Sequence, residues 1–329
     1  MPNQFERVII IMLENAAEQT VLANQYMSDL RKKGVYLENM WGITHPSQPN
    51  YIASVSGDTF GIKDDDAYWV APYVTDMDPE NDPPVTTIVD LLEAKGLSWK
   101  CYAEDIQAVD IVQPPKIFFY PPPYFVYPPP GPDKSCQTSP WFARRHVPFL
   151  SFPSVVKVPA RLANVVVADP NFEKDLAANQ LPNYTWYTPN LLHDGHSAVD
   201  ENGNVHSLSP GPESIANIAT FLQTFLGDDP LTRFPPKTLI VITFDEAFPY
   251  TEYDIYTLLI GDMLEAGTTR TEPYNLYSLL RTIEDNFGLG TLGRNDEAAT
   301  PLWFVPPSAP STTSAASAAE TGESKAAAS

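Results

Sequence analysis

Two pairs of oxygen-bearing side chains follow apolar stretches that read as buried strands. Glu14 and Asn15 come directly after VIIIML, and Asp245 and Glu246 come directly after TLIVITF. One acid after a strand is commonly the solvated start of a loop, but the repetition of the pattern indicates a site. Because all four side chains offer oxygen donors, they suit Mg²⁺, Ca²⁺ or Mn²⁺ better than zinc. The sequence therefore predicts a divalent metal ion at these residues.

A serine between two prolines is the predicted nucleophile. In the motif THPSQPN, Pro46 and Pro49 fix the backbone on both sides of Ser47, and the small residues that follow could start a helix. Backbone N–H groups at the start of a helix favour a phosphoryl oxygen. A divalent ion beside Ser47 would lower the pKa of its hydroxyl, which would make Ser47 both a metal ligand and a nucleophile.

Imidazole groups lie close to two of the predicted strand ends. His193 and His196 belong to the motif HDGHS, which follows the aromatic stretch NYTWYTPN, and His45 lies two positions before Ser47. The ligand site of an open parallel sheet lies beyond the carboxyl ends of its strands. We therefore expect these side chains to meet the carboxylates at one edge of a sheet.

Apolar stretches alternate along the chain with amphipathic ones. This order predicts an α/β fold in which a largely parallel central sheet has helices on both faces, forming a three-layer sandwich. The predicted strands cover residues 8–13, 35–40, 98–104, 183–190, 238–244 and 256–261, and the predicted helices cover residues 25–34, 86–96, 213–227 and 274–290.

The pattern predicts one domain over residues 1–305 with an insertion and a tail. Residues 114–132, PPKIFFYPPPYFVYPPPGP, can form neither a helix nor a central strand, so we expect an ordered surface loop. A polyproline docking site for a partner is the alternative interpretation. Residues 306–329 are of low complexity and predict a disordered tail.

The charge of the chain limits its partners. A net charge of −21 over 329 residues argues against binding to nucleic acids or to anionic membrane surfaces. It would also repel an anionic substrate, so phosphate chemistry would need a local cation, for which a bound metal ion is the obvious source. No partner protein is evident from the sequence.

Targeting signals and cysteines give weaker indications. No run of 18 apolar residues is present, which predicts that the chain does not span a membrane. No signal peptide is recognisable, so a cytoplasmic location is favoured, with secretion as the alternative if a leader has been removed. Cys101 and Cys136 are expected to be unpaired thiols rather than a disulfide.

Six motifs, in this order, resemble the phosphoesterase family, and in particular its fungal acid phosphatases. The motifs are VIIIMLEN, HPSQPNYIASVSGD, RRHVPF, HDGHS, VITFDE and YSLLRTIEDNFGLGTLG. This family also contains bacterial acid phosphatases and phospholipases C, and it looks like a branch of the alkaline phosphatase superfamily. The likeness extends from about residue 6 to about residue 304, except for the proline-rich insertion. It implies a metal-bound serine or threonine nucleophile and a phosphoenzyme intermediate.

The resemblance also implies roles for individual residues. It assigns metal binding to the same five residues, namely Glu14, Asn15, Ser47, Asp245 and Glu246. Arg144 and Arg145 are expected to add positive charge. Protonation of a leaving group and a structural hydrogen bond are equally open for His45. The other residues implied to act in catalysis are Asn50, which could orient a phosphoryl oxygen, His146, which matches a family histidine, and His193 and His196, which would face the phosphate.

One position departs from the family pattern. Leu276, in YNLYS, stands where relatives have a histidine that binds the second ion in two-metal members, so a full two-metal site is not expected. The expected function is that of an acid-phosphatase-like phosphomonoesterase, which acts on a small phosphorylated substrate through a phosphoserine at Ser47. A phosphodiesterase or phospholipase C, and a catalytically weakened binder of phosphorylated ligands, remain alternatives.

Overall fold

The computed structural model describes residues 3–65, 68–72, 85–107, 116–120, 126–127, 141–200 and 202–302. Its centre is an eight-stranded sheet with the strand order β14-β2-β13-β12-β1-β9-β5-β8. Neighbouring strands in this sheet are parallel except for the two pairs that β13 makes. The strands are β1 (Arg7–Leu13), β2 (Val35–Leu37), β5 (Trp99–Ala103), β8 (Val165–Val167), β9 (Tyr184–Thr188), β12 (Thr238–Phe244), β13 (Thr257–Ile260) and β14 (Thr268–Arg270).

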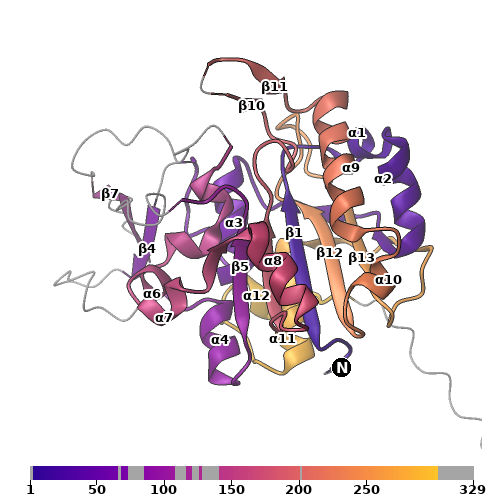
Figure 1. Ribbon diagram of the computed structural model, residues 1–329. Coiled ribbons are helices and arrows are strands. Elements are labelled where there is room, and N and C mark those ends of the chain that lie inside the picture. Colours follow the sequence, from indigo (N-terminus) through magenta and orange to yellow (C-terminus); the bar gives the residue numbers. More distant parts are fainter. Residues whose placement is uncertain are drawn as a thin grey trace, which may run out of the picture.

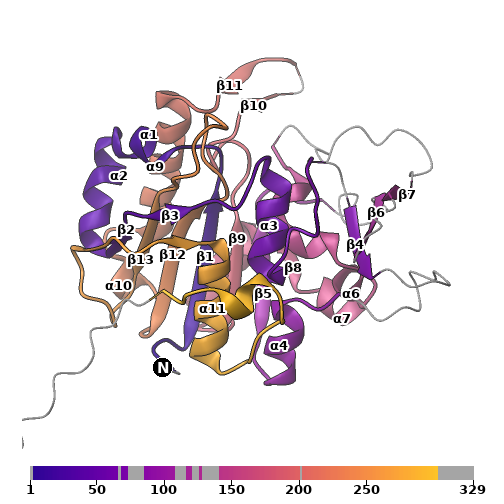
Figure 2. The same ribbon diagram turned by 180° about the vertical axis from the view of Figure 1, so that it is seen from behind.

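Helices cover both faces of this sheet. Helices α8 and α9 lie on the face turned to the reader in Figure 1, and α3 and α11 lie on the opposite face in Figure 2. The predicted three-layer α/β architecture with a largely parallel sheet is thus confirmed. The helices are α1 (Glu18–Leu22), α2 (Gln25–Leu30), α3 (Ser47–Ser56), α4 (Ile88–Ala94), α6 (Pro153–Val156), α7 (Pro159–Leu162), α8 (Ala168–Ala177), α9 (Pro212–Leu226), α10 (Pro230–Arg233), α11 (Leu276–Phe287) and α12 (Asn295–Ala298), with short 3₁₀ helices η1 (Arg31–Lys33), η2 (Arg144–His146) and η3 (Pro148–Ser151).

The two middle strands form the core of the sheet. All seven residues of β12 are buried, and so are six of the seven in β1. Parallel strands that are covered on both faces have continuous apolar sequences, which explains why VIIIML and TLIVITF show no polar alternation. The two strands end level with each other because Leu13 pairs with Phe244. Glu14 and Asp245 therefore leave the sheet side by side.

The proline-rich insertion contains strands that the sequence did not predict. Lys116–Tyr120 forms β6 and Val126–Tyr127 forms β7, and both belong to a small sheet with β4 (Tyr68–Pro72). The expectation of a loop is wrong for these two pieces, although neither joins the central sheet. The rest of residues 114–132, the tail at 306–329 and Cys136 lie outside the described residues, and Cys101 is a buried free thiol.

Two other short sheets lie away from the central one. Strand β3 (Met40–Trp41) pairs with β15 (Tyr274–Asn275), and β10 (Ala198–Val199) pairs with β11 (Val205–Ser207). The segment after β3 then passes close to the end of β12, where a Cβ atom on Gly42 would lie 3.0 Å from the carbonyl oxygen of Asp245. A glycine permits this approach. In the described part of the chain, no helix is long and apolar enough to cross a membrane.

Candidate active site

The carboxyl ends of three adjacent strands bring the predicted residues together. Strand β1 lies between β12 and β9 and is parallel to both, so the three carboxyl ends share one edge of the sheet, at the top of Figure 1 for β1 and β12. The backbone N–H of Glu14 donates to the carbonyl of Asp194, at 2.8 Å, which ties the end of β1 to the loop after β9. Asn15 has a left-handed backbone, with φ of 53°, and its N–H donates to Oδ1 of Asp245 at 3.5 Å.

Ser47 lies between carboxylates from two of these strands. It is the first residue of α3, and its side chain is buried. Its Oγ lies 3.0 Å from Oε2 of Glu14 and 2.9 Å from Oε1 of Glu246. A serine hydroxyl carries a single proton and can donate to one of these oxygens at a time. The structure thus brings Ser47 together with two of its predicted neighbours.

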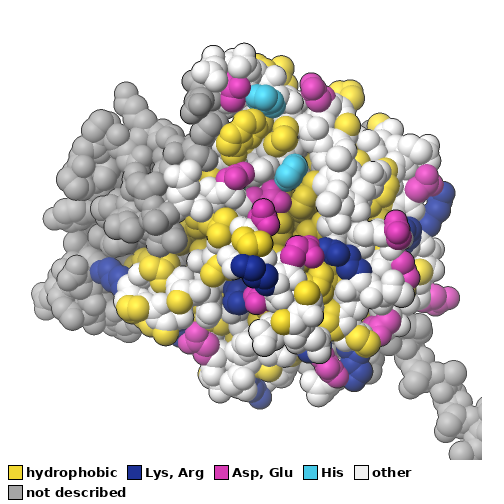
Figure 3. Space-filling view, viewed as in Figure 1, with side chains coloured by type: hydrophobic (Ala, Val, Ile, Leu, Met, Phe, Trp, Pro, Cys, Tyr) yellow, Lys and Arg dark blue, Asp and Glu magenta, His cyan; other side chains and the backbone are white. Residues whose placement is uncertain are grey.

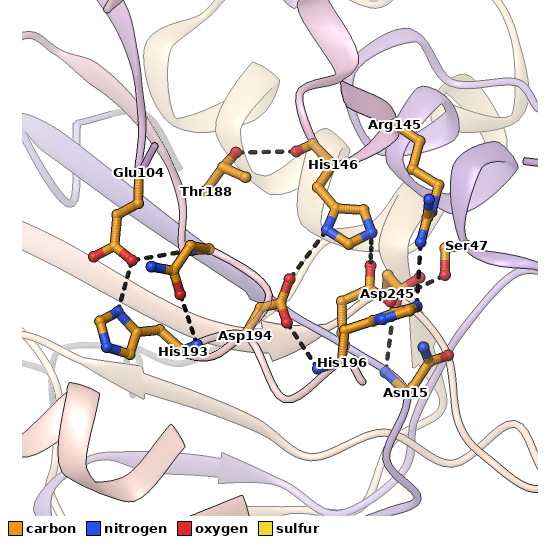
Figure 4. Close-up of polar contacts among 12 residues, drawn as sticks. Asn15, Ser47, Glu104, Arg145, His146, Thr188, His193, Asp194, His196 and Asp245 are labelled. Atoms are coloured by element: carbon orange, nitrogen blue, oxygen red, sulfur yellow. Dashed lines mark hydrogen bonds and ion pairs between the residues drawn. The ribbon is translucent and has the colours of Figure 1, made fainter. Parts of the chain in front are cut away.

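His146 links Glu14 to a carboxylate that the sequence left without a role. Its Nε2 lies 2.9 Å from Oε1 of Glu14, and its Nδ1 lies 3.0 Å from Oδ2 of Asp194 (Figure 4). The ring stacks on Tyr51 with 5.0 Å between centroids. Burial opposes a charged imidazole, but the contacts with Glu14 and Asp194 raise the pKa of His146. Against the effect of burial, His146, His196 and Arg145 lower the pKa of Glu14 to about 2.

The residues around Asp245 and Glu246 do not balance the negative charge that these two carboxyl groups carry when both are ionised. Burial, together with repulsion from Glu14, raises the pKa of Glu246 to about 8 and raises the pKa of Asp245 well above its usual value. Oδ2 of Asp245 and Oδ1 of Asn15 are buried without a hydrogen-bond partner among the described residues. Buried oxygens of this kind are normally satisfied by a proton, a cation or an ordered water molecule.

The donor set fits a hard cation by its chemistry. Glu14, Asn15, Asp245 and Glu246 provide the oxygen ligands that Mg²⁺, Ca²⁺ and Mn²⁺ prefer. In the described part of the chain, however, no group of three or more His, Cys, Asp or Glu side chains is arranged to hold a metal ion. The chemistry of these residues therefore fits a cation, although three such side chains do not form a ready-made cluster in the described part of the chain.

His196 lies beside a positive charge. Its Nε2 lies 3.1 Å from Nη2 of Arg145, and its Nδ1 lies 3.0 Å from the carbonyl oxygen of Ser197. Its backbone N–H donates to Oδ1 of Asp194 at 2.7 Å. Arg145 also favours the charged form of both Glu14 and Glu246 and so lies within electrostatic reach of Ser47.

His193 belongs to a different group of residues. Its Nδ1 lies 2.7 Å from Oε2 of Glu104, and its ring stacks on Phe221 with 5.3 Å between centroids. Figure 4 shows the pair with Glu104 to one side of the residues around Ser47. On the surface in Figure 3, His side chains lie in the upper part of the face beside Asp and Glu side chains. The expectation that His193 faces the same point as His196 is not supported by these contacts.

Asn50 and His45 hold the segment that leads to Ser47. The Asn50 amide oxygen accepts from the N–H groups of Ile43 and Thr44, at 2.9 and 3.0 Å, and its amide nitrogen donates to the carbonyls of Thr44 and Pro46. Because these bonds occupy the whole amide, Asn50 is a positioning residue and does not present the amide to a phosphoryl oxygen.

The two ring nitrogens of His45 are both occupied. Nδ1 contacts Oε2 of Glu246, and Nε2 lies 3.0 Å from the carbonyl of Glu252. The ring also packs against Tyr250 and Tyr253, with centroids 4.9 and 4.7 Å away. Of the two roles left open for His45, these contacts favour the structural one.

Three residues of the site were missed at the level of sequence. Asp194 lies inside HDGHS, so its motif was recognised but its carboxylate was not given a role. Tyr51 lies one helical turn after Ser47, and this spacing could have indicated that both side chains lie on the same side of the helix. Asp65 lies in a polar run that had no distinguishing pattern. Leu276, at the position where the resemblance leads to the expectation of a histidine, is fully buried as the first residue of α11.

Comparisons with known proteins identify the family of the chain. The model of the phosphoesterase family matches residues 23–290. A probable acid phosphatase from Kluyveromyces lactis is 32% identical over 92% of this chain and 62% of its own length. A phosphate-repressible acid phosphatase from Penicillium chrysogenum is 31% identical over 92% of this chain and 63% of its own length. The chain thus spans less than two thirds of these fungal relatives.

A comparison of folds gives a more distant match. A solved structure of a protein in the alkaline phosphatase superfamily from Vibrio parahaemolyticus is 14% identical, with a TM-score of 0.47. The match covers 90% of this chain and 70% of that chain.

Proposed function

The chain belongs to the phosphoesterase family, and from this premise we propose that it hydrolyses phosphoric esters with Ser47 as the nucleophile. The observation that carries the proposal is the position of the Ser47 hydroxyl, which lies 3.0 Å or less from carboxylate oxygens of Glu14 and Glu246. A serine attacks only when a neighbouring group takes its proton or lowers its pKa. Because Glu14 already pairs with His146, we assign Glu246 as the proton acceptor.

The reaction follows from this geometry in two steps. The Ser47 oxygen attacks phosphorus in line while its proton passes to Oε1 of Glu246. The bond between phosphorus and the ester oxygen breaks, and the leaving oxygen takes a proton from water and departs as the alcohol. Water then cleaves the phosphoserine and releases inorganic phosphate. Of the two histidines expected to serve the second step, we assign His196. Its ring lies beside Arg145 and 5.8 Å from the ring of His146, which contacts Glu14.

Charge balance supports a divalent cation in this mechanism. Glu14, Asn15, Asp245 and Glu246 would hold the ion, as the unpartnered oxygens of Asn15 and Asp245 suggest. When bound, such an ion supplies positive charge that favours ionisation of the serine and offsets the charge of the phosphoryl group. The cationic Arg145 side chain adds to that charge from the protein itself.

A small phosphomonoester is the substrate class that we propose. Fungal relatives named as acid phosphatases support this choice. The test compares nitrophenyl phosphate with bis-nitrophenyl phosphate, each with and without a chelator. Acid quenching during turnover of a ³²P-labelled monoester should trap label on Ser47. Faster turnover of the diester would favour a phosphodiesterase or phospholipase C, and the absence of trapped label would remove the phosphoserine step.

Leu276 favours a second candidate function. Because it places a buried alkyl group where relatives have a histidine, the chain would bind phosphorylated ligands with little turnover. Leu276→His separates the two functions, since a large gain in rate at an unchanged phosphate affinity would mean that the native site is impaired. An unchanged or lower rate would favour a site that is complete without this histidine.

A further inference from the structure

Asp65 carries a negative charge into the region where a phosphoryl group would bind. Its Oδ1 accepts a hydrogen bond of 3.0 Å from the backbone N–H of Gln48, the residue next to Ser47 in the first turn of α3. Free N–H groups and the helix dipole make this turn favourable for an anion. The carboxylate of Asp65 therefore already occupies one of the donors that a phosphoryl oxygen would use.

The side chain of Arg145 lies near the same carboxylate. Its Nε lies 3.9 Å from Oδ2 of Asp65, and the Arg145 side chain is 11% exposed whereas that of Asp65 is 38% exposed. A guanidinium and the N–H groups at the start of a helix can both bind a phosphoryl group, and here the two lie next to each other. The negative charge of Asp65 also contributes to the raised pKa of Glu246, which places Asp65 within electrostatic reach of the groups around Ser47.

We propose that Asp65 determines the affinity of the site for phosphate, because its carboxylate occupies the position of a phosphoryl oxygen at the start of α3 and a substrate must displace it. This inference rests on the proposed function, in which Ser47 attacks a phosphoryl group. Displacement of the carboxylate is possible because it is partly exposed and belongs to the segment after α3 rather than to a central strand. Asp65 is thus a specificity-determining residue and takes no part in bond breaking.

Competition between Asp65 and phosphate predicts the direction in which the phosphate affinity changes when Asp65 is replaced. A carboxylate and a phosphoryl oxygen are both anionic acceptors, and a single backbone N–H cannot serve both at full strength. Two like charges about 4 Å apart also repel each other even where solvent screens them. Removing the charge of Asp65 should therefore tighten phosphate binding, whereas a carboxylate that merely oriented Arg145 would weaken binding when removed.

The direct test is calorimetric titration of the full-length chain with inorganic phosphate in the presence of MgCl₂. Asp65→Asn keeps an oxygen that can accept from Gln48 but removes the charge, and Asp65→Ala removes both. We expect the dissociation constant for phosphate to fall by about tenfold in Asp65→Asn, and further in Asp65→Ala. The matched control is Asp64→Asn, which makes the same charge change at the adjacent, exposed residue and should leave the dissociation constant within about twofold.

A kinetic measurement separates this role from a structural one. With nitrophenyl phosphate, both Asp65 variants should show a lower KM and a lower inhibition constant for phosphate, without a rise in kcat. Phosphate affinity that is unchanged or weaker in both variants, or that is undetectable in every protein, would overturn the proposal. The proposed function is tested separately, because it fails if turnover is absent or does not depend on Ser47. The phosphate titrations decide the role of Asp65 in either case.

Discussion

The hydroxyl oxygen of Ser47 lies 2.9 Å from Oε1 of Glu246, although the two residues are 199 positions apart in the chain. The opposite carboxylate oxygen of Glu246 contacts Nδ1 of His45, so the serine and the histidine that precedes it share one carboxylate. The parallel pairing of β1 with β12 adds Glu14 on the other side of the hydroxyl. Sheet topology, rather than proximity in sequence, therefore assembles the site.

Ser47→Ala should abolish turnover. Because the variant removes the attacking oxygen, we expect kcat to fall by 10⁴-fold or more, roughly the scale of losing a covalent nucleophile. Ser54→Ala is the matched control, since Ser54 lies on the same helix and donates to the carbonyl of Asn50. Both variants should be assayed with nitrophenyl phosphate. Residual activity within about tenfold of the parent in Ser47→Ala would mean that another residue attacks phosphorus.

A divalent ion should stabilise the folded chain. Binding to the native state alone adds about 2.7 kcal/mol to the free energy of unfolding at a free ion concentration 100 times the dissociation constant. Chemical unfolding with MnCl₂ and with EDTA measures the difference. Asp245→Asn should remove the stabilisation by the ion without lowering the stability in EDTA, because it removes one of several carboxyl groups that repel one another.

The control for this experiment is Asp228→Asn, at an exposed residue. It should keep the full response to the ion, since it lies outside the proposed ligands. An equal response to MnCl₂ in Asp245→Asn and in the parent would show that the ion binds elsewhere.

The two histidines of HDGHS should behave differently on substitution. His196→Gln removes a ring that contacts Arg145, so we expect kcat/KM to fall by about 10²- to 10⁴-fold if the ring serves proton transfer. His193→Gln breaks a contact with Glu104 away from Ser47, so kcat/KM should stay within about tenfold. Steady-state kinetics on both variants, with melting temperatures to check folding, gives the comparison. Equal losses in the two variants would contradict the arrangement described here.

The sequence was informative wherever a residue continued a regular element. Apolar runs identified β1 and β12, and a parallel sheet then required that Glu14 and Asp245 leave it at the same edge, which the pairing of Leu13 with Phe244 confirms. The small residues after Ser47 likewise predicted the helix that became α3, which ends at Gly57 with φ of 76°. Periodicity and the rules of sheet topology were sufficient for these features.

The positions of side chains in loops could not be predicted from the sequence. His193 and His196 are two histidines of one short motif. The turn between them directs the first to Glu104 and the second to Arg145. Nothing in a local pattern distinguishes these outcomes, because each depends on a segment about 50 to 90 positions away. For the same reason, Asp65 gave no signal before its contact with Gln48 was known.

Asn50 should contribute to both stability and activity. It is fully buried, and its amide makes four hydrogen bonds to the backbone before Ser47. Asn50→Ala leaves those backbone groups unpaired, which should cost about 2 to 4 kcal/mol in the free energy of unfolding and should also lower kcat. Asn50→Asp keeps the acceptor but turns a carboxylate oxygen toward the carbonyls of Thr44 and Pro46 and buries a charge, so its cost should be at least as large. A loss of kcat without a loss of stability would mean that Asn50 acts on the substrate after all.

Stability should fall with rising pH because of Glu284 in α11. This carboxyl is fully buried close to Asp296, which accepts from the N–H groups of Leu292 and Arg294. Burial first, and then repulsion from Asp296, raise the pKa of Glu284 to about 9. Because the pKa in the folded state exceeds that of the unfolded chain, the contribution to stability is complete below about pH 4.5 and is lost as the pH rises toward 9.

Glu284→Gln isolates this effect from the other titrating groups. The amide is nearly isosteric with the protonated acid and does not titrate, so the variant should gain stability relative to the parent as the pH increases from 5 to 9. Urea unfolding at pH 5, 7 and 9 measures the difference between the two proteins. The nearby charges of Arg281 and Asp285 are present in both, so they cancel in this comparison. A constant difference across the pH range would mean that Glu284 is ionised in the folded chain and that a cation, rather than a proton, compensates its charge.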